Sequence, residues 1–376
     1  MRQGMLGLFA LVALASVSGA SGASVPPVSG LAVRSIQGSL VISSLSGDDK
    51  RALTKPRGTG ERRKDYLPTW SPDGSQVAFA RWTPNQLSLM VVKSDGSGLR
   101  RVATLSRRQR LYEDSLAAIS WSPDASQLAY DAYTPVGKSS TEAIYVAAAD
   151  GSSVRQIALR PKNAYAFFSL FGWTPDGRRV TYALSGGEPL SLDYEGPSDL
   201  MTTSADGTDT TKLLRAGDID WAFWLADGSL LYVRNCLLPS ACQLVLRTPS
   251  GSSRPLTHFR IPDWVGCCQW DGLDLVQRPT KGEIVYEHSR KVYDFSPTTN
   301  MTRTVHVFRC PRKRCQPLDD DVSLAGVSRD GRVALVEYSN YGGNGDYMRD
   351  YRLDLETGAV TRIHLVTTDP DQIYLS

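Results

Sequence analysis

The chain has 376 residues, of which 41% are hydrophobic and 22% are charged, a composition that excludes general disorder, a long coiled coil and a polytopic membrane protein. Its 42 Lys and Arg residues against 39 Asp and Glu residues leave a net charge of +3, too small a basic excess to predict a nucleic-acid partner. Its 32 glycines and 21 prolines are the turn residues that many short strands require.

The N-terminus has the pattern of an export signal. Arg2 supplies a positive charge, residues 6–17 form an uncharged and mostly apolar stretch, and the small residues 18–23 offer two cleavage sites. The apolar stretch is shorter than the roughly 20 residues that a membrane-spanning helix needs. We therefore expect residues 1–23 to be a signal peptide, and the mature chain 24–376 to be secreted or periplasmic without a membrane span.

Six cysteines fit an exported protein, in which an even number favours disulfides. Two pairs are close in sequence, and we expect each to close a short loop. Zinc is the alternative, but neither spacing is that of a C-x2-C knuckle. The adjacent third pair is compatible with a vicinal disulfide, two free thiols or links to the other pairs. The candidates are Cys236 with Cys242, Cys310 with Cys315, and Cys267 beside Cys268.

An internal repeat of about 51 residues organises the chain. The segment WSPDGSQVAF at 70–79 returns as WSPDASQLAY at 121–130, WTPDGRRVTY at 173–182 and WLADGSLLY at 224–232. Two eroded copies follow, with Gln277 and Val327 at the tryptophan position. The six positions are separated by 51, 52, 51, 53 and 50 residues, and the first three copies carry a second Asp-Gly turn.

The chemistry of each copy predicts two β-hairpins. In Ser-Pro-Asp-Gly, proline presets φ, aspartate can hydrogen-bond its own backbone, and glycine accepts the positive φ that follows. The strands between the turns are apolar on both faces, which indicates cover above and below. Four short strands per copy, repeated radially, predict an all-β β-propeller. The turn and core residues then have structural roles: Trp70, Asp73, Trp121, Asp124, Trp173, Asp176, Trp224 and Asp227.

These motifs resemble the TolB-type (WD-like) β-propeller repeat of exported bacterial proteins, over roughly residues 31–366. The resemblance implies a propeller scaffold in the cell envelope. TolB itself has an N-terminal α/β domain before its propeller, for which this chain leaves only a few residues after the signal. TolB's role in envelope integrity therefore does not transfer whole.

Residues 31–54 contain three expected strands but no innermost tryptophan strand, and residues 373–375 form a spare C-terminal strand. Joining the two gives six whole blades and one composite blade, with the ring closed by pairing of the N- and C-terminal segments, as in the family, and no open edge. Seven four-stranded blades are thus the first expectation, and six the alternative. Either way, we expect residues 24–376 to form one monomeric domain.

The short turns should lie on one face of the ring and the long connections on the other. Long loops on a rigid scaffold commonly carry binding residues. We expect long connections at residues 55–65, 107–114, 131–142, 184–199, 257–270, 288–302 and 338–349. Aromatic residues in them are the binding candidates, with packing over the central channel as the alternative role: Tyr112, Tyr133, Tyr194, Trp264, Tyr293 and Tyr341.

Sequence motifs for catalysis are absent: the chain has no G-x-S-x-G, no H-E-x-x-H and no phosphate-binding glycine loop. Residues 319–321 and 340–350 offer oxygen ligands for Ca²⁺ without the spacing of a known calcium loop. We therefore expect a non-catalytic scaffold that binds a protein or an envelope polymer through the long-loop face and needs no cofactor. The alternative is a propeller hydrolase or lyase with carboxylates and a cation at the central channel.

Overall fold

The computed structural model describes residues 31–36, 38–44, 50–55, 62–105, 109–111, 119–136, 139–160, 168–185, 198–214, 219–234, 243–256, 275–278, 283–288, 291–308, 320–328, 330–340 and 347–363. All regular elements in these ranges are β-strands, and none of the ranges contains a helix that could cross a membrane. The expected signal peptide and all six cysteines lie outside the described residues.

The described residues form twenty-seven strands in seven antiparallel sheets, each built from strands consecutive in sequence. The first sheet has three strands: β1 (Leu31–Ile36), β2 (Ser39–Ser44) and β3 (Arg51–Ala52). The next three sheets have four each: β4 (Lys64–Trp70), β5 (Gln76–Thr83), β6 (Gln86–Lys93) and β7 (Arg100–Leu105); β8 (Ile119–Trp121), β9 (Gln127–Val136), β10 (Ser139–Ala148) and β11 (Val154–Leu159); β12 (Phe168–Trp173), β13 (Arg179–Ser185), β14 (Ser198–Ser204) and β15 (Thr210–Leu214).

The last three sheets also have four strands each. They are β16 (Ile219–Trp224), β17 (Leu230–Arg234), β18 (Gln243–Arg247) and β19 (Ser253–Pro255); β20 (Leu275–Arg278), β21 (Glu283–His288), β22 (Lys291–Ser296) and β23 (Met301–Val307); β24 (Asp320–Val327), β25 (Val333–Asn340), β26 (Tyr347–Asp354) and β27 (Val360–Ile363).

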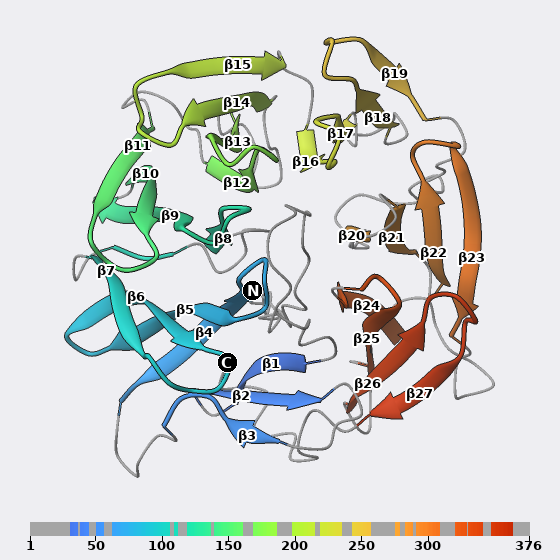
Figure 1. The fold of residues 1–376 in the computed structure, drawn as a ribbon, viewed down its shortest axis with the longest axis horizontal. Coiled ribbons are helices and arrows are strands. Elements are labelled where there is room, and N and C mark those ends of the chain that lie inside the picture. Colours follow the sequence, from blue (N-terminus) through green and yellow to red (C-terminus); the bar gives the residue numbers. More distant parts are fainter. Residues whose placement is uncertain are drawn as a thin grey trace, which may run out of the picture.

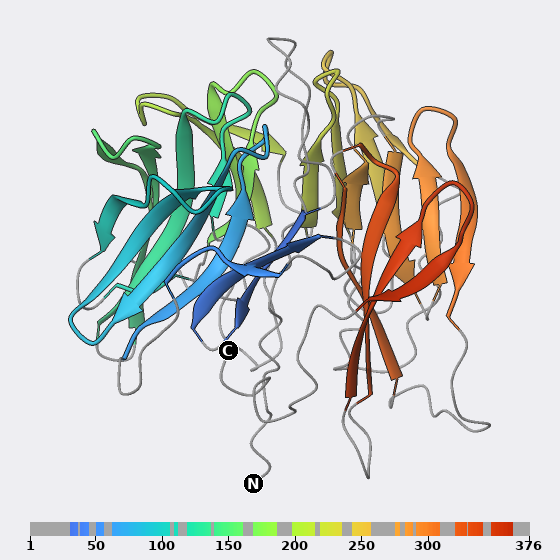
Figure 2. The same ribbon diagram turned by 60° about the horizontal axis from the view of Figure 1, so that its bottom comes forward.

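The sheets stand around a ring (Figure 1). The first strand of each four-stranded sheet lies nearest the centre, and the fourth lies at the rim. Turning the molecule shows the strands running between the two faces of the ring (Figure 2). The predicted all-β propeller of four-stranded blades is therefore confirmed.

Six blades are four-stranded, as in the six-blade alternative, and the three-stranded sheet lies in the ring between β24–β27 and β4–β7 (Figure 1). Strand β1 pairs with β2 only, among the described residues. The strand that we expected to complete this sheet, at 373–375, lies outside them, so ring closure by the C-terminal segment stays a prediction.

Apolar side chains between neighbouring sheets make the core. In β5, Val77 to Ala80 are fully buried, because successive side chains point to opposite faces and both faces are covered. Buried clusters link each pair of successive sheets from β1–β3 to β24–β27. Phe79 and Phe295 are among the largest fully buried side chains.

The first hairpin turns have the predicted backbone. Gly74 and Gly177 adopt φ values of 71° and 68°. The second copy has Ala125 at this position, with φ at 59°, and its N–H still donates to the Ser122 carbonyl at 2.9 Å. A Cβ atom in the left-handed region is strained, so this turn carries a cost that the glycine copies avoid.

We expect Ala125→Gly to raise the free energy of unfolding by about 1 kcal/mol, because it removes this strain. Urea denaturation of the two proteins measures the change. Gly177→Ala is the matched control: an added Cβ would meet Pro123 only at an ordinary 3.5 Å, so its expected loss reflects the backbone. Equal stability of Ala125→Gly and the parent would contradict the strain.

Two of the predicted long loops are wrong. Strands β9 and β10 cover the expected loop 131–142 except for residues 137–138, and β22 and the start of β23 occupy most of 288–302. Both segments are rich in β-branched and aromatic residues, which favour strands. The hairpins therefore extend further than the repeat pattern alone indicated.

Candidate functional site

The turn aspartates are held within their own turns. Asp73 accepts the Ser71 hydroxyl at 2.6 Å, the Ser75 N–H at 3.0 Å and the Ser75 hydroxyl at 2.7 Å. Ser71 Oγ in turn accepts the Gln76 N–H at 2.9 Å. Burial opposes the ionisation of Asp73, but the hydrogen bonds from Ser71 and Ser75 outweigh it and keep the pKa of Asp73 below its usual value.

The same arrangement recurs in four other sheets, with a Ser or Thr two residues before the aspartate in three of them. These carboxylates also accept backbone N–H groups of their turns. The four residues are Asp124, Asp176, Asp227 and Asp330. Their oxygens are occupied by the fold, which gives these aspartates a structural role.

The second turns carry aspartates of the same kind. Hydrogen bonds from the Ser204 and Thr208 hydroxyls and from the Thr208 N–H lower the pKa of Asp206 to about 2. The pKa values of Asp95 and Asp150 are also lowered, chiefly by hydrogen bonds from Ser97 and Ser152.

Acid should destabilise the propeller through these turns. A carboxylate whose folded pKa is depressed contributes stability above its unfolded pKa of 3.8, and this contribution is lost as the pH falls through the folded value, about 2 for Asp206. We expect Asp206→Asn to melt below the parent at pH 7, with the difference shrinking between pH 4 and pH 2. Melting curves across pH 2–7 measure it. A difference independent of pH would show that the carboxylate charge is not involved.

The repeat tryptophans tie neighbouring sheets together. Trp121 Nε1 donates to the Thr69 carbonyl at 3.2 Å, and Trp173 Nε1 donates to the Ser120 carbonyl at 3.1 Å. Trp224 Nε1 instead donates to the Thr181 hydroxyl at 2.8 Å. The buried Nε1 of Trp70 has no acceptor among the described residues. Trp70 lies in β4, the first strand after the three-stranded sheet. That sheet is the one for which we expect an innermost strand from the C-terminal segment.

Four of the aromatic binding candidates lie outside the described residues: Tyr112, Tyr194, Trp264 and Tyr341. Tyr293 lies in β22, half-buried, and packs against the cluster between β16–β19 and β20–β23. Tyr133 lies in β9, half-buried, near the end of the strand away from the short turns. The two described candidates are therefore on different sheets and do not form one site.

Tyr133 is held beside basic residues. Its N–H donates to the Arg110 carbonyl at 2.9 Å, and the Arg110 N–H donates back to the Tyr133 carbonyl at 2.8 Å. Tyr133 is paired in register with the buried Glu142, whose carbonyl accepts the Arg160 N–H at 2.9 Å. At this end of the sheet the half-buried Tyr133 thus lies beside the backbone of Arg110, and Arg160 lies two strands away, directly after β11.

A buried ion pair lies near the same end of the neighbouring sheet β4–β7. Asp65 in β4 has no exposed surface, and Arg81 in β5 binds it with two hydrogen bonds, from Nε to Oδ1 at 2.7 Å and from Nη2 to Oδ2 at 2.8 Å. The Arg81 guanidinium also lies over the Phe79 ring, 5.3 Å from its centroid. The sequence did not predict this pair, because the two residues lie 16 apart and neither belongs to the repeat motif.

A second feature that the sequence analysis did not predict is a recurring contact, here called an arginine clasp. It joins neighbouring sheets on the short-turn side of the ring. In each clasp, an arginine on the rim strand donates to the carbonyl of the residue that follows the third strand of the next sheet. The part of the chain that the structure describes contains four clasps: Arg51 with Ser94, Arg100 with Ala149, Arg254 with Pro297 and Arg303 with Leu355.

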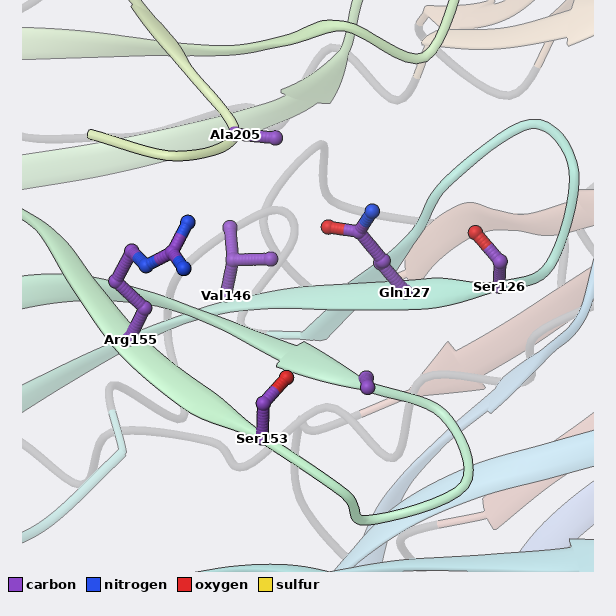
Figure 3. A pocket seen from close by; sticks show the side chains of 7 residues that line it. Ser126, Gln127, Val146, Ser153, Arg155 and Ala205 are labelled. Atoms are coloured by element: carbon purple, nitrogen blue, oxygen red, sulfur yellow. The ribbon is translucent and has the colours of Figure 1, made fainter. Parts of the chain in front are cut away.

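One pocket of about 360 Å³ lies where another clasp is expected, between β8–β11 and β12–β15. Residues in and beside the two short turns of β8–β11 line the pocket, together with Ala205 of the sheet β12–β15 (Figure 3). The seven lining residues are Ser126, Gln127, Val146, Ala148, Ser153, Arg155 and Ala205. In the part of the chain that the structure describes, no group of three or more His, Cys, Asp or Glu side chains could hold a metal ion.

No protein-family model matches the chain, and no curated protein sequence matches it. Solved structures do. A prolyl endopeptidase is 15% identical with a TM-score of 0.63, over 93% of this chain and 50% of that one. The present chain thus spans about half the length of that enzyme. At this identity the likeness shows the fold.

Two shorter proteins match over most of both chains. An oligogalacturonate lyase in complex with manganese is 14% identical with a TM-score of 0.57, over 85% of each chain. The β-propeller domain of the trilobed protease from Pyrococcus furiosus, described as having an open velcro topology, is 11% identical with a TM-score of 0.55, over 96% of this chain and 100% of that one. TolB from Acinetobacter baumannii also matches, but its TM-score of 0.43 carries no weight for the family.

Proposed function

We propose that this chain is an exported, non-catalytic β-propeller of the TolB-like kind that binds a protein or an envelope polymer through its long-loop face. The observation that carries the proposal is the setting of Tyr133, which the two-way backbone pairing with Arg110 holds in place. A partly exposed, rigidly placed aromatic next to an arginine is the composition of a binding hot spot. The carboxylates of the repeat turns, by contrast, are already used within their turns.

The two faces can be compared directly with a photo-reactive amino acid, benzoylphenylalanine, placed in the exported full chain. One protein carries it in place of Tyr133, and the matched control carries it in place of Leu99, an exposed apolar residue of a short turn. We expect cross-linked adducts on the source cell envelope from position 133 and not from position 99. Digestion of the adduct by protease or by glycosidases then distinguishes a protein from a polymer.

Affinity measurements complete the test once that adduct is identified. Tyr133→Ala should weaken binding at least tenfold, because a true aromatic hot spot contributes 2 kcal/mol or more. Tyr133→Phe keeps the ring and should lose much less. Adducts formed equally well from position 99, or only from it, would place binding on the wrong face of the ring.

The alternative, a hydrolase or lyase with a cation at the central channel, makes a different prediction. Asp131 and Glu142 are almost fully buried carboxylates on the second and third strands of their sheet, and their register puts them on the same side of the β9–β10 hairpin. A cation held by them would therefore lie inside the blade, beside the innermost strand β8 rather than on the axis. If they serve a cation, Mn²⁺ or Ca²⁺ should raise the melting temperature of the parent, and Asp131→Asn should abolish that rise. A scaffold that uses them only within the fold should show no such metal dependence.

A further inference from the structure

The arginine clasps mark equivalent positions in the sheets, so that each sheet can be compared with its neighbours. Three of the four residues that accept a clasp also donate their own N–H to a carbonyl in the first turn of their own sheet: Ser94 to Ser75, Ala149 to Ser126 and Leu355 to Arg332. The fourth, Pro297, has no N–H to donate. Ala205 does the same to Arg178 at 2.9 Å. Ala205 is therefore the position at which β12–β15 should accept a clasp.

The donor for that clasp is also present. Arg100 is paired in register with Val91, and Arg155 is paired in the same way with Val146. Arg100 donates through Nε to Ala149 at 2.8 Å and through Nη2 to Gln76 Oε1 at 2.6 Å. Counted along the repeat, Gln127 corresponds to Gln76, so β8–β11 has both residues of the Arg100 arrangement.

The clasp is nevertheless open at this interface. Among the described residues, the Arg155 guanidinium makes no hydrogen bond to Ala205 or to Gln127, and Arg155 is exposed. The side chains of Arg155, Gln127 and Val146 point instead into the space below Ala205 (Figure 3). The pocket of about 360 Å³ is the volume that a closed clasp would reduce.

The lining of the open clasp suits one kind of group. A guanidinium presents a planar fork of N–H donors that matches a carboxylate, and the Gln127 amide adds donors beside it. Val146 and Ala148 provide an apolar floor for methylene groups. The carboxylate of Asp206 interacts electrostatically with Arg155, but its hydrogen bonds come from Ser204 and Thr208.

We propose that the open clasp between β8–β11 and β12–β15 is a binding site for an acidic peptide, with a glutamate side chain of the peptide seated on Arg155 and Gln127. The glutamate methylenes lie on Val146 and Ala148, and its carboxylate takes the place that a main-chain carbonyl occupies in the closed clasps. The site is on the short-turn side of the ring, so it is separate from the Tyr133 region and stands or falls independently of the function proposed above.

The probe is the peptide acetyl-Ala-Glu-Glu-Ala-amide, titrated into the ¹⁵N-labelled mature chain while the arginine Nε resonances are followed. We expect the Arg155 signal to shift, and the Arg100 signal, which comes from a closed clasp, to stay. The isosteric peptide acetyl-Ala-Gln-Gln-Ala-amide should cause no shift. Arg155→Gln should weaken binding at least tenfold, and Arg155→Lys less, because lysine keeps the charge and loses the fork.

Thermal stability separates a ligand site from a fifth clasp. Arg100→Gln should lower the melting temperature and leave peptide binding unchanged, whereas Arg155→Gln should leave the melting temperature unchanged. The proposal is overturned if Arg155→Gln destabilises the protein as much as Arg100→Gln and the peptide does not bind. Binding of inorganic phosphate or polygalacturonate without binding of the acidic peptide would also overturn it.

Discussion

Replacing Arg81 by Ala should lower the free energy of unfolding by about 3–5 kcal/mol, because it leaves the fully buried Asp65 carboxylate without its bidentate partner. Solvent cannot compensate at a side chain with no exposed surface. Denaturation in urea, followed by tryptophan fluorescence, measures the loss as a lower midpoint.

Two further variants test this explanation. Arg81→Lys keeps a positive charge but loses the double hydrogen bond, so its cost should lie between those of the parent and Arg81→Ala. The double variant Asp65→Leu with Arg81→Met removes both charges and should recover much of the lost stability. If Arg81→Ala costs less than about 1 kcal/mol, in the range of an exposed pair, the burial of Asp65 does not have the energetic role assigned to it.

Replacing Trp121 by Ala should cost about 3–5 kcal/mol, as large aromatic truncations in a packed core do. Trp121 lies in the buried cluster between β4–β7 and β8–β11, together with Tyr66 and Leu89. The variant also loses the hydrogen bond to the Thr69 carbonyl. Two sheets lose a shared contact at once, so the unfolding midpoint in urea should fall sharply.

The structure offers a matched control for the hydrogen-bond part of that loss. Trp121→Phe keeps a ring and removes the donor, and Trp70→Phe makes the same chemical change where the described residues provide no acceptor. We expect Trp121→Phe to cost about 1 kcal/mol more than Trp70→Phe. Equal costs would show that the indole donors add nothing to the packing between sheets.

The fold could be predicted from the sequence because the same pattern of turns and strands recurs in several copies of the repeat. The Asp-Gly turns require positive φ, and the strands between them are apolar on both faces, so Gly74 and Val77 carry the same information as Gly177 and Val180. The limits of the hairpins were less well predicted. The eroded fifth copy predicts a loop at Tyr293, whereas β-branched and aromatic neighbours extend β22 through it.

The candidate sites could be predicted less well, for a physical reason. A clasp joins a side chain to a main-chain carbonyl of another sheet, and every residue has such a carbonyl. The contact therefore leaves no motif at the acceptor. The pair Asp65 and Arg81 is likewise set by strand register. Only the alignment of Arg100 with Arg155, counted from the Asp-Gly turns, contained a signal, and it predicts a clasp in both sheets rather than the difference that the structure has.

The acceptors of the arginine clasps have a consequence for how such a ring can diverge. The four accepting residues are a serine, an alanine, a proline and a leucine: Ser94, Ala149, Pro297 and Leu355. Since the bond uses the backbone oxygen, the accepting position is free to change its side chain without loosening the neighbouring blade. Substitutions at the accepting position leave the clasp hydrogen bond intact, so only the arginine residue has to be kept for the clasp to form. A duplicated blade can therefore accumulate changes, as the last two copies have, while it stays fastened to its neighbours.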